Sequence, residues 1–323
     1  FIVYPLAAAI GLAYAVHCLT PDYINGSSTF WFLGDPAQHI STWWAFMQDQ
    51  WNYPLLKTTR LNYPEGMILA FADALPLMAL LMKPFRPWLA DTFHYFGYYA
   101  VLSVALQAVT GVLLVRAAGV RDFLSGVLAA VLFATSPIMI WRFFGHISLT
   151  SHYLLVAALV LYLLSTNGAI RRRHGLFLIA YTLLACAALL VHPYFLVMVM
   201  VIYLAAMVDA DATTMHRFER IAGPPVTVAV LLVMMGVLGY FQVGGQGGGG
   251  FGYYSTNPLG FVYGGWLLDH FRPGQVTYDP FGGQYEGNPY PGLGVLLLLV
   301  FVAMRCTRTD LVRLCRRYRA LLA

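Results

Sequence analysis

The stretch FHYFGYYAVLSVALQAVTGVLLV, residues 93–115, decides the fold class of this chain. It contains no Asp, Glu, Lys or Arg, and a helix of about 20 such residues crosses the hydrocarbon core of a bilayer. Comparable apolar runs occupy Phe1–Leu19 (a first span or the remainder of one), Phe123–Trp141, Leu149–Leu164, Leu176–Val208, Val226–Val243 and Pro291–Met304. The run at 176–208 is long enough for two helices with a turn at its His-Pro pair. The sequence therefore predicts an all-α integral membrane protein with about eight transmembrane helices.

The composition agrees with this class and excludes others. Of 323 residues, 59% are hydrophobic and only 10% are charged, whereas a soluble domain carries about 25% charged residues. The net charge of +5 comes from short basic runs between apolar segments, so we expect no nucleic-acid partner. The four cysteines lack metal-ligand spacing, which argues against a disulfide framework and a cysteine zinc site.

The basic residues indicate a topology. Met67–Met82 is apolar but interrupted by Asp73 and Pro76, so it is either a span or a re-entrant segment. If it does not cross, thirteen of the nineteen Lys and Arg fall on one side of the membrane. If it crosses, the cluster Arg171–Arg173 shares a side with the aromatic segment 31–46, against the positive-inside rule. We therefore predict a non-crossing segment and cytoplasmic chain ends.

This topology divides a single domain, residues 1–323, into recognisable parts. Residues 20–92 form a long first periplasmic loop with interfacial or re-entrant helices, and the glycine-rich residues 244–290 form a second periplasmic loop. That second loop is predicted to be flexible, as a lid, because no nucleotide-binding context follows its glycines. The basic tail 305–323 is cytoplasmic and suits the surface of an anionic leaflet.

The first loop contains the polar, aromatic stretch WFLGDPAQHISTWWAF, residues 31–46. Asp35 followed by Pro36 indicates a helix start, with an interfacial helix over 37–51. Asp35 is a candidate general base or metal ligand, and the alternative is that it only caps the helix. His39 lies four residues later, so a helix would place it on a nearby face.

More ionisable groups are predicted on the same periplasmic side. Asp73 interrupts the apolar run FADALPL, where an unpaired charge is costly, so it faces an aqueous cavity or pairs with a group such as His146. His146 opens a span, and His152, six residues on, falls on a different helical face. Arg142 holds a phosphate or anchors a membrane boundary. We expect His192 at a tight turn, either capping backbone groups or lining a site with Tyr194.

Several motifs together carry a family resemblance. GDPAQH (34–39), NYPEG (62–66) with FADALPL (71–77), FFGHISLTSH (143–152) and VHPYF (191–195) resemble a family of bacterial multi-span membrane proteins that is similar to the GT-C glycosyltransferases. The resemblance continues in order through FGYYS and YEGNPYPGLG, almost to the end of the chain. It implies a GT-C-like helix bundle in the bacterial inner membrane. It also implies a polyprenyl-phosphate-linked sugar as donor and an acceptor on the periplasmic side.

The resemblance also implies roles for residues. Asp35 matches the essential acid of the first outer loop in that family, where a pair of acids is common. Here Gly34-Asp35 is accompanied by His39, which leaves the need for a divalent cation open. GT-C proteins usually carry a soluble C-terminal domain, so this chain is either truncated or lacks one.

The expected function is therefore sugar transfer, with Asp35 as general base and His39 beside it. The expected substrate-binding residues are Asp73, Arg142, His146, His192, Tyr194 and Glu286, the last a second carboxylate from the opposite end of the chain. No cofactor is required other than that open divalent cation. The expected partners are membrane lipids and a membrane protein. The alternatives are a non-catalytic subunit of a larger complex and a lipid or polysaccharide transporter, although no internal repeat supports a transporter.

Overall fold

The computed structural model describes residues 2–143, 145–167, 174–210, 217–242, 256, 258–262 and 289–323. These residues are mostly helical, with one short antiparallel pair of strands, β1 (Lys57–Thr58) and β2 (Met67–Ile68). The predicted all-α fold is confirmed. Glu286 and most of the glycine-rich segment 244–290 lie outside the described residues.

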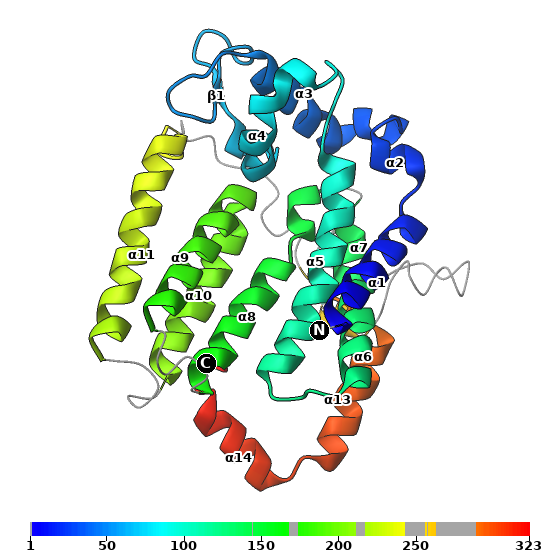
Figure 1. The fold of residues 1–323 in the computed structure, drawn as a ribbon, viewed down its shortest axis with the longest axis vertical. Coiled ribbons are helices and arrows are strands. Elements are labelled where there is room, and N and C mark those ends of the chain that lie inside the picture. Colours follow the sequence, from blue (N-terminus) through cyan, green and yellow to red (C-terminus); the bar gives the residue numbers. More distant parts are fainter. Residues whose placement is uncertain are drawn as a thin grey trace.

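Apolar helices form the body of the molecule and run between its two ends (Figure 1). They are α1 (Val3–Cys18), α5 (Phe96–Ala117), α6 (Phe123–Ala134), α8 (Tyr153–Thr166), α9 (His174–Val191), α10 (Pro193–Asp209), α11 (Arg217–Leu238) and α13 (Leu293–Arg305). Within the described part, three stretches are long and apolar enough to cross a membrane: Phe96–Ala117, Ile147–Thr166 and Glu219–Leu238. On α13 no residue is buried and leucines are exposed, as expected for a helix that contacts lipid.

The segment between α1 and α5 folds over one end of the bundle, called here the α3 end (Figure 1). It comprises α2 (Pro21–Asn25), the 3-10 helix η1 (Thr29–Phe32), α3 (Gly34–Gln48), η2 (Leu69–Ala72), α4 (Pro76–Met82) and η3 (Lys83–Trp88). Helix α4 has seven residues and is therefore only about 10 Å long. This length agrees with the prediction that Met67–Met82 does not cross a membrane.

Some predicted boundaries were wrong. The interfacial helix expected over 37–51 is α3, which begins earlier and ends earlier. The run Phe123–Trp141 is not one helix: α6 ends at Ala134, and α7 (Pro137–Arg142) begins at a proline that cannot continue a helix because it lacks an N–H. The turn before α8 is the 3-10 helix η4 (Ile147–Thr150).

Helix α5 is at the centre of the packing. It contacts α1, α2, α6 and α8, and α8 leads through α10 and α9 to α11. Two glycines permit close backbone approaches to α5. A Cβ on Gly11 of α1 would lie 2.7 Å from Cα of Ala105, and one on Gly97 of α5 would clash with the carbonyl oxygen of Ile24. Larger side chains at these two positions would push α1 and α2 away from α5.

The opposite end of the bundle gathers the loop after α5 and the C-terminal helix α14 (Arg308–Arg317) (Figure 1). A capping box between Thr307 and Asp310 begins α14. A short 3-10 helix, η5 (Pro258–Phe261), lies in the sequence before α13.

A buried carboxylate organises the loop that follows α3. Asp49 accepts hydrogen bonds from the backbone N–H groups of Gln50 and Thr59 and from the side chains of Asn52, Thr58 and Thr59. Burial raises the pKa of Asp49, but these hydrogen bonds outweigh it and hold the pKa below its usual 3.8. The ionised carboxylate therefore stabilises the loop that leads to the candidate site.

Replacing Asp49 with Asn is expected to lower the free energy of unfolding by about 1–2 kcal/mol at pH 7, because the amide has one acceptor oxygen instead of two. The Asp49 carboxylate stabilises the folded state fully above pH 3.8. This stabilisation is lost as the pH falls through the lowered pKa that Asp49 has in the folded state. The difference between variant and parent should thus shrink near pH 3. Thermal unfolding in detergent at both pH values measures this, and equal stability at pH 7 would contradict it.

Candidate functional site

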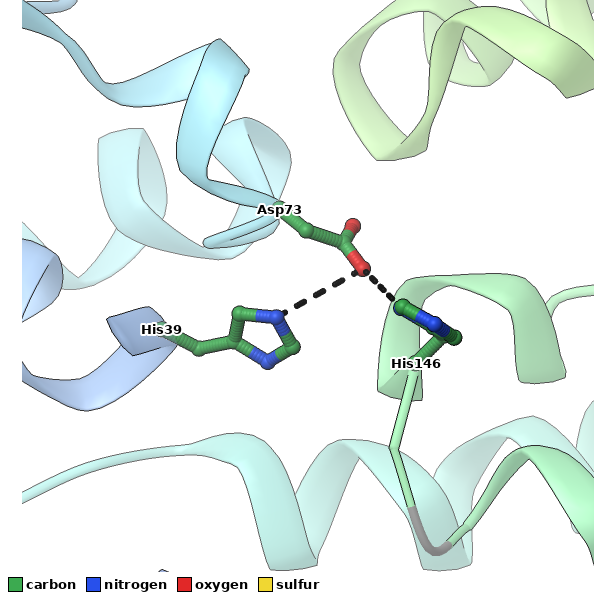
Figure 2. Close-up of side chains that lie close together, drawn as sticks. All are labelled: His39, Asp73 and His146. Atoms are coloured by element: carbon green, nitrogen blue, oxygen red, sulfur yellow. Dashed lines mark ion pairs between the residues drawn. The ribbon is translucent and has the colours of Figure 1, made fainter. Parts of the chain in front are cut away.

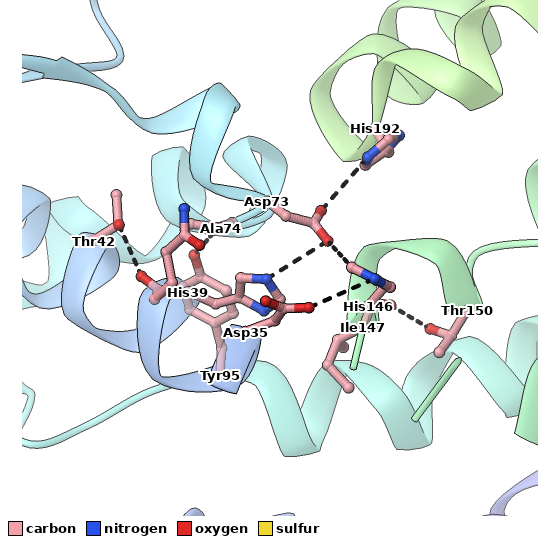
Figure 3. A network of polar contacts seen from close by, with 11 residues as sticks. Asp35, His39, Thr42, Asp73, Ala74, Tyr95, His146, Ile147, Thr150 and His192 are labelled. Carbon is pink, nitrogen blue, oxygen red and sulfur yellow. Dashed lines mark hydrogen bonds and ion pairs between the residues drawn. The ribbon is translucent and has the colours of Figure 1, made fainter. Parts of the chain in front are cut away.

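Five acidic and imidazole side chains from four separate segments meet at the α3 end of the bundle (Figure 3). We call them the Asp–His cluster. Helix α3 supplies two members, and the loop between η2 and α4, the residue before η4 and the turn between α9 and α10 supply one each. The members are Asp35, His39, Asp73, His146 and His192.

Asp73 is the centre of the cluster (Figure 2). Its Oδ2 lies 3.7 Å from Nε2 of His39 and 3.6 Å from Nδ1 of His146, and its Oδ1 lies 3.9 Å from Nε2 of His192. Its side chain is 16% exposed. The sequence raised two alternatives for Asp73, a cavity or a pairing with His146, and the pairing is observed.

The backbone around Asp73 is shaped to present this carboxylate. Asp73 and Leu75 both have left-handed backbone angles, with φ of 51° and 50°, a conformation that Asp tolerates better than most residues. The buried Tyr95 hydroxyl donates a 2.5 Å hydrogen bond to the carbonyl of Ala74, between the two. The loop is thereby fixed with Asp73 pointing toward the imidazoles.

The contacts in the cluster are long. At 3.6–3.9 Å they exceed the usual range of about 2.7–3.2 Å for direct hydrogen bonds. Among the residues that the structure describes, both oxygens of Asp73 and Nδ1 of His39 are buried without a hydrogen-bond partner. Buried polar atoms are normally paired, so the spacing suits a small charged ligand between these side chains.

Asp35 lies at the edge of the cluster. Its side chain is 56% exposed, and its Oδ2 is 3.7 Å from Nε2 of His146. Helix α3 begins at Gly34 and has no side-chain cap, so Asp35 does not serve as the helix cap considered above. The spacing of Asp35 and His39 suggested that these two side chains act together. In the structure, His39 contacts Asp73 instead.

His192 has both of the roles that the sequence left open. Its Nδ1 accepts a 3.2 Å hydrogen bond from the backbone N–H of Tyr194, so it caps α10. Its Nε2 faces Asp73. An imidazole that accepts at Nδ1 carries its proton on Nε2, so His192 presents an N–H to the carboxylate.

Burial and neighbouring groups shift the pKa values of the cluster members in ways that determine their charges. Burial raises the pKa of Asp73, but the neighbouring His146, His39 and His192 outweigh it, and the pKa falls below its usual value. Burial lowers the pKa of His39 and that of His192, in both cases against the opposing effect of Asp73. Near pH 7 the cluster therefore presents an ionised carboxylate to neutral imidazoles at positions 39 and 192.

The other predicted site residues are Arg142, Tyr194 and Glu286. Arg142 is the last residue of α7. Tyr194 is 64% exposed, with its ring against that of His192. The position of Glu286 is not among the described residues.

Sequence reasoning missed two contributors. The Tyr95 hydroxyl supports the Asp73 loop from the start of α5. The hydroxyl of Ser148 in η4 is buried, and its presence near the cluster lowers the pKa of the Asp73 carboxyl. Ser148 lies in the quoted FFGHISLTSH motif, so its proximity to His146 was a usable signal, whereas nothing local to Tyr95 indicates its partner.

Three members of the cluster have the composition of a metal site. The ligand atoms of His39, Asp73 and His146 all lie within 4.8 Å of one another. Imidazole nitrogens with one carboxylate oxygen are ligands suited to divalent first-row ions such as Zn²⁺. The cluster can also move protons, since carboxylates and imidazoles are the usual general acids and bases.

Comparison with known proteins places the chain in a family. Neither the curated proteins nor the solved structures include a match to it. The family described as "Domain of unknown function (DUF6311)" matches residues 8–323, which is nearly the whole chain. The chain therefore belongs to the DUF6311 family.

Proposed function

We propose that this protein is a membrane glycosyltransferase of the GT-C type. It transfers a hexose or pentose from a polyprenyl-phosphate-linked donor to an acceptor. The single observation that carries the proposal is the Asp–His cluster, which gathers acid and imidazole groups at one end of an apolar helix bundle. Ionisable groups at such positions are costly and tend to serve function.

The membrane arrangement is part of the proposal. The eight apolar helices would be the eight spans, the shorter ones crossing with the help of their flanking residues. The basic α14 lies at the end opposite the cluster (Figure 1), which the positive-inside rule makes the cytoplasmic end. The cluster then faces the periplasm from the bacterial inner membrane, where a lipid-linked donor is available and no nucleotide is needed.

Asp35 is the proposed general base because it is the exposed member of the cluster. Its carboxylate removes the proton from an acceptor hydroxyl, and the oxygen attacks the anomeric carbon of the donor. The bond between that carbon and the phosphate oxygen breaks, and the lipid phosphate leaves with the electron pair. His146, 3.7 Å from Asp35, orients the carboxylate.

The leaving phosphate requires positive charge or hydrogen-bond donors. His192 and His146 face the carboxylates of the cluster, so their role here is to orient Asp35 and Asp73. Arg142, four residues before His146 in the sequence, is the proposed cation for the phosphate. Tyr194 and Glu286 complete the proposed substrate-binding set.

The test is transfer by the full chain in proteoliposomes supplied with a panel of polyprenyl-phosphate hexoses and pentoses. Asp35→Asn is expected to lower the transfer rate about 100-fold or more, because it removes the base. Asp22→Asn is the matched control, since Asp22 is an exposed acid in the same segment and outside the cluster. Unchanged transfer by the Asp35 variant would overturn the assignment of the base.

A further inference from the structure

We propose that Nε2 of His39, Nδ1 of His146 and Oδ2 of Asp73 bind one late first-row divalent metal ion, of which Zn²⁺ is the best representative. The first support is convergence. Both nitrogens face the same carboxylate oxygen, at 3.7 and 3.6 Å, and all three ligand atoms lie within 4.8 Å of one another. Ligands about 2.0–2.1 Å from a tetrahedral Zn²⁺ lie roughly 3.3 Å apart. Small rotations of the three side chains would close this difference.

The second support is the tautomer of His146. Its Nδ1 faces Asp73 and its Nε2 faces Asp35, 3.7 Å away. A neutral imidazole that binds a metal through Nδ1 carries its proton on Nε2, where a carboxylate is the usual acceptor. Asp35 occupies that acceptor position, so the cluster contains a carboxylate–histidine–metal arrangement.

The third support is the role of His192. Because its Nδ1 accepts from the Tyr194 N–H, its Nε2 carries the proton and has no lone pair for a metal. It can instead donate to Oδ1 of Asp73, which is the oxygen it faces. His192 is therefore a positioning residue that leaves Oδ2 of Asp73 for the ion, as outer partners of metal-binding carboxylates do.

Burial supplies the fourth support. Both oxygens of Asp73 are buried without hydrogen-bond partners among the described residues, and the His39 side chain is 3% exposed. A buried acceptor without a partner is unfavourable. A cation at Oδ2, with the His192 N–H turned onto Oδ1, would satisfy both oxygens.

The donor set selects the class of ion. Two imidazole nitrogens and one carboxylate oxygen suit Zn²⁺ and its neighbours, whereas Mg²⁺ and Ca²⁺ prefer oxygen ligands throughout. Three protein ligands leave a coordination position for water or a substrate oxygen, which is the pattern of catalytic rather than structural sites. The catalytic meaning of the ion rests on the proposed function, but its binding does not.

Binding is tested on the full chain purified in detergent, stripped with a chelator and titrated with Zn²⁺. We expect one tightly bound ion per chain, and X-ray absorption at the zinc edge should show imidazole ligands at about 2.0–2.1 Å. His39→Ala and His146→Ala should each lower the affinity at least about 100-fold, and Asp35→Asn about 10–100-fold, as loss of an outer partner does. His17→Gln is the matched control, because His17 is exposed on α1, away from the cluster.

The outcomes separate the two proposals. Less than one ion per chain, an affinity unchanged by His39→Ala, or a zinc spectrum without imidazole would overturn the metal site. The spectrum of the parent protein decides even where a variant does not fold. One bound ion without transfer from any donor in the panel would leave the metal site standing and contradict the glycosyltransferase. Full transfer by the stripped protein would leave the enzyme standing and contradict a catalytic role for the ion, whereas its binding is decided by the titration and the zinc spectrum.

Discussion

Replacement of Asp73 by Asn is expected to lower the rate of sugar transfer by about 1000-fold or more. Asp73 is the carboxylate that three imidazoles share, so its charge fixes the orientation of all of them. The substitution preserves the shape of the side chain. Asn also tolerates the left-handed backbone at this position. The change therefore removes the charge with little disturbance of the loop, and proteoliposome transfer assays measure its effect.

The control for this variant is a comparison of folding. The melting temperature of Asp73→Asn in detergent should stay close to that of the parent, because the buried oxygens of Asp73 have no hydrogen bonds to lose. A transfer rate within about tenfold of the parent would mean that the cluster is not the reaction centre. A collapse in melting temperature together with activity would assign Asp73 a structural role instead.

The second large effect is expected at the opposite end of the bundle, at Asp209. This carboxylate ends α10, and its side chain is only 1% exposed. It accepts a 2.7 Å hydrogen bond from the Tyr162 hydroxyl of α8 and bonds from the backbone N–H groups of Ala320 and Leu321. The Nε of Arg319 lies 3.7 Å from Oδ1 of Asp209. Asp209 thus ties the segment after α14 to two helices of the bundle.

Asp209→Ala is expected to lower the free energy of unfolding by about 3 kcal/mol, because it leaves buried donors without an acceptor. The segment after α14 should detach, so trypsin should cleave more rapidly after Arg317 and Arg319. Thermal unfolding and limited proteolysis in detergent measure the two effects.

The matched control for Asp209 is Tyr162→Phe. It removes one of the same hydrogen bonds and should cost only about 1 kcal/mol, with the tail still attached. If Asp209→Ala and the parent protein melt and are cleaved alike, the tail is held by other contacts.

Membership in the DUF6311 family leaves the function open, so the site carries the functional argument. Two separate claims concern the same cluster. The exposed Asp35 is proposed as a general base, and a metal ion is proposed to bind at His39, Asp73 and His146. They meet at His146, which contacts Asp35 through one nitrogen and Asp73 through the other. His146 variants should therefore affect transfer and metal binding together, whereas Asp35→Asn should affect transfer more than binding.

Much of the fold was readable from the sequence because it depends on local composition. Runs such as residues 93–115 must satisfy their backbone groups internally in a bilayer, which requires a helix. The start of α10 follows from the proline at residue 193, which the sequence indicated. The break before α7 at Pro137 was missed, although its cause is also a proline. The non-crossing of Met67–Met82 was read from the distribution of Lys and Arg, and the seven-residue α4 agrees with it.

Candidate members of the site were also readable one at a time. Asp35, His39, Asp73, His146 and His192 each stand out as ionisable groups in apolar or interfacial surroundings, where such groups are costly without a purpose. Their predicted location on one side of the membrane indicated that they gather, but not which side chains touch. The i, i+4 spacing suggested that Asp35 and His39 act together, yet His39 contacts Asp73.

Only the tertiary structure decided that Asp73 is the centre and that His146 links it to Asp35. These contacts join residues from separate segments, and their geometry depends on the left-handed turn at Asp73 and the support of Tyr95 below Ala74. The proton positions on His146 and His192 likewise depend on partners, an acidic side chain and a backbone N–H, that only the folded chain brings within reach. The sequence by itself determined which groups are costly to place in a membrane, because that cost is local. Which of these groups interact with one another depends on distances of a few ångströms between helices, and the packing of the folded chain determines those distances.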